Sequence, residues 1–253
     1  MFGLKRDARI SGDLQGRICV MGTSHTIALQ QAQKKGHAAD VHVLNLNQTP
    51  RIYTRGGTAL YLEHLHLTNP GLLALSVGGN QHAAFALLEH PRRYAVWPDD
   101  TPVPPGRRAR TLIPHATMRA VLAERSANYF DAVRALRAHF ADTPAVLICP
   151  PPPLRNADRI MDRPVPITAP DHAPDRPVRI APPVFRKAVY DIQVALTRAL
   201  ATEIGADFIA PPEAALMGEG FLAPRYAGRD ATHCNSNYGK LVLDQLVTHH
   251  KAL

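Results

Sequence analysis

The stretch Arg17–Thr26, with the sequence R-I-C-V-M-G-T-S-H-T, decides the fold prediction. Its apolar residues Ile18–Met21 indicate a buried strand, Gly22 breaks the strand, and a helical pattern follows from Thr26. A strand that turns sharply into a helix places Ser24 at the carboxyl edge of a parallel sheet, where open α/β folds bind ligands. The free N–H groups of the first helical turn favour negative charge at the same place. Taken alone, Ser24 is also explained as the N-cap of the helix, which is the more common role of such a serine.

Four more short apolar segments alternate with helical patterns along the chain. This alternation predicts a five-stranded parallel sheet that is covered by helices on both faces. Right-handed crossovers then give a three-layer α/β/α sandwich, formed as a single domain over residues 1–253. Helical spacing also predicts a helix over 58–67, and residues 1–16 read as an entry arm. The further strands are expected at 41–46, 72–77, 145–149 and 207–209, with helices at 25–36, 81–89, 115–141, 184–204 and 237–249.

Two proline-rich segments interrupt the pattern, at about 99–110 and 150–183. Both follow predicted strands, so we expect them near the rim of a pocket at the carboxyl edge of the sheet. Their prolines favour ordered loops, because each proline lowers the entropy lost on ordering. The second segment is long for a connection inside a compact domain, which is typical of a functional loop.

The composition is that of a globular protein, with 45% hydrophobic and 20% charged residues and a formal charge of +8. No block of basic residues interleaved with aromatics is present, so a solvated basic surface explains the charge better than a nucleic-acid partner. The three cysteines have no metal spacing, and the stretch Glu63-His64-Leu65-His66 has no third ligand at metal spacing to join its two histidines. We therefore expect no metal, cofactor or membrane partner, and a cytoplasmic protein without an export signal. Neither the charge nor the pattern predicts an oligomeric state.

Four side chains that together suit ester cleavage follow the predicted strands or precede the last helix. Ser24 is a candidate nucleophile, His233 a base, Asp230 the group that orients the base, and Asn80 a donor to an oxyanion. The Asp-x-x-His spacing lets the carboxylate hold Nδ1 while Nε2 faces the serine. We expect His233 Nε2 within about 3.5 Å of Ser24 Oγ, or slightly farther without a ligand.

The motifs that carry these residues resemble a known family. Gly22-Thr23-Ser24, Gly78-Gly79-Asn80 and Asp230-Ala-Thr-His233 are similar, in order and spacing, to blocks I, III and V of the SGNH (GDSL-type) hydrolases. The resemblance implies a flavodoxin-like three-layer fold and hydrolysis or transfer of O-acyl groups without a metal. By the same match, Ser24, Asp230 and His233 form the catalytic triad.

The resemblance also implies an oxyanion hole formed by the backbone of Ser24, by Asn80 and by a glycine after the second strand. Gly57 is our candidate for that glycine, with Gly56 close behind. Two positions depart from the family pattern: Thr23 stands where an aspartate is usual, and Gln81 follows Asn80 where many members have aspartate. The other candidates for lining the pocket are Gly56, Gly79, His82 and His25, although His25 should point elsewhere as the next helical residue.

The sequence therefore predicts a serine esterase for a small acyl ester. The reaction we expect is removal of an O-acetyl group from a carbohydrate or a small natural product. Two other functions fit the same residues or the same fold. An O-acyltransferase would use the same acyl-enzyme, because the choice between water and a hydroxyl depends on how dry the pocket is. A non-catalytic binding module could retain the fold, but it has no need of the complete set Ser24, Asn80, Asp230 and His233.

Overall fold

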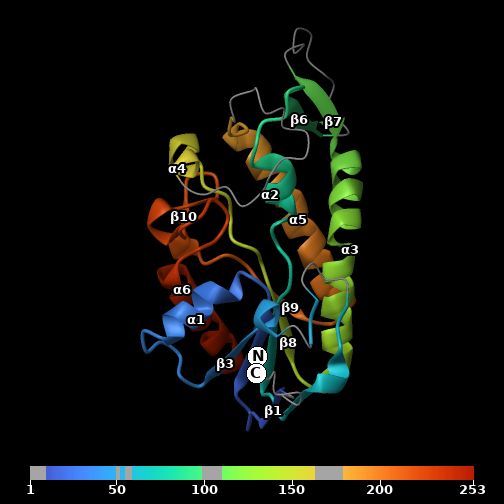
Figure 1. Ribbon diagram of the computed structural model, residues 1–253, viewed down its shortest axis with the longest axis vertical. Coiled ribbons are helices and arrows are strands. Elements are labelled where there is room, and N and C mark those ends of the chain that lie inside the picture. Colours follow the sequence, from blue (N-terminus) through green and yellow to red (C-terminus); the bar gives the residue numbers. More distant parts are fainter. Residues whose placement is uncertain (1–9, 50–51, 55–58, 99–109, 163–178) are drawn as a thin grey trace, which may run out of the picture.

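A five-stranded parallel sheet forms the centre of the computed structural model, which describes residues 10–49, 52–54, 59–98, 110–162 and 179–253 (Figure 1). The strand order is β3-β2-β5-β8-β9. Counted along the chain this order is 2-1-3-4-5, which is the flavodoxin-like arrangement. The predicted fold class is therefore confirmed. The strands are β2 (Ile18–Gly22), β3 (Val41–Asn45), β5 (Leu72–Ser76), β8 (Ala145–Ile148) and β9 (Asp207–Ile209).

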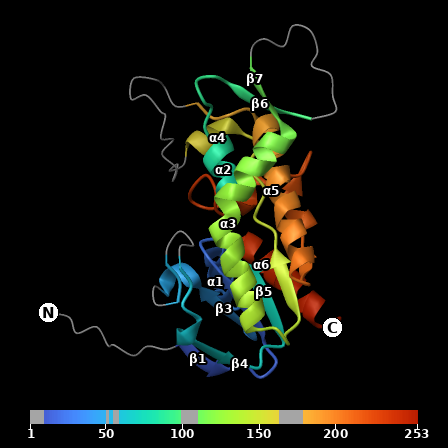
Figure 2. The same ribbon diagram turned by 90° about the vertical axis from the view of Figure 1, so that its right-hand side faces the viewer.

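Helices cover both faces of the sheet, because its inner strands are apolar throughout. Alternate residues of β2 point to opposite sides, so Val20 packs into one core and Met21 into the other. On the first side lie α1 (Thr26–Gln33) and α6 (Ser236–His250). On the second lie α3 (His115–His139) and α5 (Pro183–Glu203), as Figure 2 shows.

The contact between α1 and α6 depends on one glycine. A Cβ atom on Gly239 would lie 2.1 Å from the Ala28 carbonyl oxygen, so only glycine allows the two backbones to approach this closely. The turn and the helix that follow β2 are thereby fixed against the last helix of the chain.

Beyond the carboxyl edge of the sheet, α3 and α5 continue upward and carry a smaller structured region (Figure 2). A third apolar cluster, which includes Leu122, Phe185 and Val189, holds this region together. The elements here are α2 (Gln81–Ala86), α4 (Ala157–Met161) and a parallel pair, β6 (Tyr94–Trp97) with β7 (Thr111–Pro114). The described residues also form a β10–β11 hairpin (Leu216–Met217 and Phe221–Leu222) and four 3₁₀ turns: Leu46–Gln48, Leu62–His64, Glu213–Ala215 and Pro224–Tyr226.

The predicted helix over 58–67 is wrong for the part that the structure describes. After the 3₁₀ turn at 62–64 the chain forms β4 (Leu65–Thr68), whose residues alternate between buried and exposed. This strand pairs in parallel with β1 (Ile10–Asp13), so the expected entry arm contributes a strand to a second, two-stranded sheet. The apolar spacing of the segment fits both periods, and a pairing partner more than fifty positions away decided between them.

The other predicted elements are present, with helix ends shifted by a few residues. The helix expected over 81–89 ends at Ala86, because Leu88 forms a β-bridge with Ile180 and the Glu89 N–H donates to the Arg179 carbonyl. All three cysteines are free and buried. In the described part of the chain, no helix combines the length and the apolar character that crossing a membrane requires.

Candidate active site

The turn after β2 is tied to the turn after β5 by hydrogen bonds. The Thr23 N–H donates to the Ser76 carbonyl (3.0 Å), and the Gly78 N–H donates to Thr23 Oγ1 (3.1 Å). Thr23 is buried, and its own carbonyl accepts the Thr26 hydroxyl at 2.6 Å. The residue that departs from the family pattern therefore joins the serine-bearing turn to the Gly-Gly-Asn turn.

Ser24 lies in this turn, partly buried, before the helix begins. Its carbonyl accepts the Ile27 N–H at 3.2 Å, but the hydroxyl makes no hydrogen bond to another described residue. The N-cap position of α1 is His25, and no side chain caps that helix end. The N-cap explanation of Ser24 is therefore not what the structure shows. A serine hydroxyl that does not cap its helix remains available for chemistry.

Asp230 and His233 form a close pair in the loop before α6. Asp230 Oδ2 accepts a hydrogen bond from His233 Nδ1–H at 2.7 Å. The proton is assigned to Nδ1 because an ionised carboxylate can only accept. Asp230 Oδ1 accepts the backbone N–H groups of Thr232 (2.8 Å) and His233 (2.9 Å). Burial raises the pKa of Asp230, but the hydrogen bonds from His233 and Thr232 outweigh it and hold the pKa well below its usual value. The carboxylate is therefore ionised and fixes the ring.

The other ring nitrogen of His233 is buried and has no hydrogen-bond partner among the described residues. The predicted bond from Ser24 Oγ to this Nε2 is thus not formed in the structure. Catalytic hydrogen bonds in ligand-free enzymes are often long and tighten only with substrate. Because the carboxylate keeps the proton on Nδ1, Nε2 carries a lone pair and can act as a general base.

His25 faces the site, contrary to the expectation that it points elsewhere. Its ring lies 5.3 Å from the His233 ring, centroid to centroid, and it packs against the turn that contains Gly79. The reason is that α1 begins one residue later, so His25 still belongs to the turn. Burial, together with the nearby His233 and His82, lowers the pKa of His25 to about 3. His25 is therefore neutral at physiological pH.

Asn80 follows the two glycines at the start of α2 and lies partly buried. Gly79 has a φ of +111°, and a Cβ there would lie 3.0 Å from His25 Cδ2, so the position requires glycine. The Asn80 side chain is near enough to His25 to favour the protonated ring slightly. It does not cap α2, while Gln81 Oε1 accepts the Gly79 N–H at 2.9 Å and so stabilises the turn. The second departure from the family pattern thus has a structural role.

The sheet order and the position of these three motifs beyond one sheet edge agree with what the resemblance implies. The chain has the flavodoxin-like three-layer fold that this resemblance implies. No family model and no curated protein matches the sequence.

Solved structures similar to this chain include three that are described as ester-acting enzymes. A GDSL-like lipase from Bacteroides thetaiotaomicron is 15% identical, with a TM-score of 0.43, over 94% of this chain and 90% of that one. A putative acylhydrolase from Bacteroides fragilis is 13% identical, with a TM-score of 0.45, over 98% and 96%. Axe2, an acetylxylan esterase from Geobacillus stearothermophilus, is 10% identical, with a TM-score of 0.42, over 96% of each chain.

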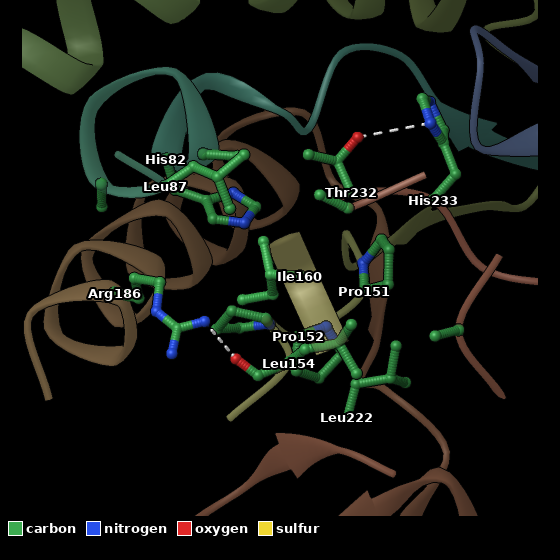
Figure 3. A pocket seen from close by; sticks show the side chains of 15 residues that line it. His82, Leu87, Pro151, Pro152, Leu154, Ile160, Arg186, Leu222, Thr232 and His233 are labelled. Carbon is green, nitrogen blue, oxygen red and sulfur yellow. Dashed lines mark hydrogen bonds between the residues drawn. The ribbon is translucent and has the colours of Figure 1, made fainter. Parts of the chain in front are cut away.

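A small cavity opens beside His233 (Figure 3). It has about 20 Å³ of space for a group the size of a water molecule. His82 lines it, as predicted, and burial lowers the pKa of His82 to about 4, so the ring is neutral. The other walls are mostly apolar and include Ala83, Ala86, Leu87, Pro151, Pro152, Pro153, Leu154, Ile160, Leu222, Ala227 and Ala231.

The proline-rich segment over 150–183 reaches this cavity through its described residues, since 151–154 and Ile160 form part of the wall. That agrees with its expected place at the rim, while 163–178 lie outside the described residues. Of the segment over 99–110, only Arg110 is described. It pairs with Glu89 at 3.1 Å and lines a different groove, beside β6 and β7. The predicted oxyanion glycines Gly56 and Gly57 also lie outside the described residues.

Sequence reasoning missed Arg186, which lines the same cavity. Nothing in its local pattern distinguishes it, because it sits in a helix among other charged residues such as Lys187. Its only signal is spatial: the side chain is 2% exposed, where arginine is almost never fully buried unless paired.

Proposed function

We propose that this protein is a serine ester hydrolase in which Ser24 is the nucleophile, His233 the general base and Asp230 the residue that orients the base. The observation that carries the proposal is the state of His233. Its Nδ1 is held by an ionised carboxylate at 2.7 Å, and its buried Nε2 is without a partner among the described residues. The Ser24 hydroxyl, which bonds to no other described residue, lies in the turn whose next residue, His25, packs beside the His233 ring.

In this mechanism His233 Nε2 takes the proton of Ser24 Oγ as the oxygen attacks the ester carbonyl carbon. Asp230 stabilises the imidazolium that forms, without taking up the proton itself. The oxyanion is stabilised by the Ser24 N–H and by the Asn80 amide, with Gly57 as the third donor implied by the resemblance. The Ser24 N–H makes no bond to another described residue, which supports this role. His233 then returns the proton to the leaving alcohol, and water cleaves the acyl-enzyme by the same steps.

The small size of the cavity supports a small acyl group such as acetyl over a long acyl chain. A carbohydrate or a small natural product bearing an O-acetyl group is the substrate class that we propose. Transfer to a hydroxyl instead of water uses the same acyl-enzyme, so the product identifies the acceptor.

A fluorophosphonate probe and a series of p-nitrophenyl esters from acetate to octanoate test this function. We expect labelling of Ser24 and fastest hydrolysis of the shortest esters, and Ser24→Ala should abolish both. Ser11→Ala is the matched control, because Ser11 is exposed on β1, away from the carboxyl edge of the central sheet. Labelling or turnover that persists in Ser24→Ala would show that another group performs the chemistry.

A further inference from the structure

Arg186 is a buried cation that has no counter-ion among the described residues. It lies near the start of α5, and its side chain is 2% exposed. Nη1 donates to the Leu154 carbonyl at 2.5 Å and Nη2 to the Arg155 carbonyl at 2.7 Å, but Nε has no partner among the described residues. No carboxylate of the described chain lies within ion-pair distance of the guanidinium. Burial lowers the pKa of Arg186 to about 10, so the group still carries its charge at neutral pH.

This cation shares a cavity with the proposed catalytic base. Figure 3 shows Arg186 across the cavity from Thr232 and His233, with Ile160 and Pro151 between them. Apart from Arg186 and the two histidines, the lining is mainly apolar. A charge in such surroundings interacts strongly with an anion, because little water screens it.

Holding the loop at 154–155 does not by itself explain a buried charge. Arg137 performs a comparable task elsewhere, donating to the carbonyls of Phe140 and Ala141, and it is only partly buried. Two carbonyl dipoles offset part of the cost of removing a guanidinium from water, whereas a carboxylate or phosphate would offset far more. The planar guanidinium is also the side chain best suited to bind such anions through paired hydrogen bonds.

We propose that Arg186 is a specificity-determining residue that binds a negatively charged group of the substrate inside this cavity. The inference rests on the proposed esterase function and narrows its substrate class to esters that carry a compact anion, a carboxylate or a phosphate. The charge can belong to the acyl group or to the alcohol. The small volume of the cavity excludes a long chain between the anion and the scissile ester.

Two pairs of esters distinguish a charge on the acyl group from a charge on the alcohol. Mono-p-nitrophenyl succinate carries its charge in the acyl group, and p-nitrophenyl 4-methylpentanoate is its neutral counterpart of similar shape. The ester 4-acetoxybenzoate carries its charge in the alcohol, and 4-acetoxybenzamide is its neutral counterpart. In the wild type we expect kcat/KM for one charged ester to exceed that of its counterpart by about 10- to 100-fold, the range of a charge-assisted hydrogen bond.

The preference for the charged ester, not the absolute rate, is the readout in the variants. This preference should be lost in Arg186→Met and partly kept in Arg186→Lys. For the charged ester, KM should change more than kcat. Arg137→Met is the matched control, since it removes an arginine that binds carbonyls at the C-terminal end of α3 and does not line the cavity, and the preference should remain. A wild type without any preference, or an equal preference in Arg186→Met, overturns the inference.

Binding of anions that cannot react keeps this test independent of catalysis. Monomethyl succinate and methyl phosphate, titrated into the wild type by calorimetry, should bind, and Arg186→Lys should weaken the binding about 10-fold or more. If the wild type binds neither anion, the inference fails even if esters are hydrolysed. If an anion binds through Arg186 but no ester is cleaved and Ser24 is not labelled, the proposed function fails and the anion site stands.

Discussion

Replacing Asp230 by asparagine tests the Asp–His pair by changing a single atom. Asparagine retains Oδ1, so the bonds from the N–H groups of Thr232 and His233, at 2.8 and 2.9 Å, can persist and the loop should keep its conformation. Oδ2, which accepts His233 Nδ1–H at 2.7 Å, becomes an NH₂ group that cannot accept a proton. The amide favours a proton on Nε2 instead, and that tautomer cannot take the serine proton.

The size of the effect follows from these contacts. A hydrogen bond to a charged group contributes about 1.5–3 kcal/mol, so its loss alone predicts roughly a 10- to 150-fold lower rate. The wrong tautomer adds to this, and in the serine-protease triad the equivalent exchange costs about 10⁴-fold. We expect kcat for Asp230→Asn to fall by about 10²- to 10⁴-fold. The free energy of unfolding should fall by less than about 3 kcal/mol, because both side chains are about a quarter exposed and water screens the pair.

The assay is steady-state hydrolysis of p-nitrophenyl acetate, with urea unfolding of the same samples. Asp207→Asn is the matched control, since Asp207 pairs with His249 at 3.3 Å through an exposed carboxylate. Its rate should stay within threefold of the wild type. A folded Asp230→Asn variant with near wild-type kcat would refute the role of Asp230 in orienting the base.

Two further predictions concern stability. His25 and His82 have pKa values of about 3 and 4 in the folded protein and about 6.5 when unfolded, so below pH 6.5 the unfolded chain binds more protons. The free energy of unfolding should therefore be independent of these groups above pH 6.5 and fall as the pH drops toward 4, by up to about 1.4 kcal/mol per pH unit for each ring. In His82→Gln, urea unfolding from pH 7 to 5 should show a shallower dependence of this free energy on pH. An unchanged dependence would contradict the burial of a neutral ring. Gly239→Ala should destabilise the fold by about 2 kcal/mol or more, because its Cβ would lie 2.1 Å from a carbonyl oxygen of α1, and an unchanged melting temperature would contradict that close contact.

The central sheet could be predicted because its strands leave a distinct local signal. Strands that are buried on both faces read as short, continuous apolar runs, as at 72–77 and 145–149. The segment over 58–67 has no such signal, since its apolar residues fit a helix and a strand equally. Its pairing with β1 could not be read locally, because the partner is distant in the sequence.

The sequence by itself determined the strand-turn-helix that presents Ser24 and the spacing that lets Asp230 hold His233, because both depend on residues within a few positions of each other. Only the tertiary structure decided that Thr23 joins the two motif turns, that His25 packs against the His233 ring and that Arg186 is buried with no counter-ion in the described part of the chain. Each of these depends on contacts between segments far apart in the chain. Burial and the direction of a side chain are set by what packs against it, and no local pattern records that.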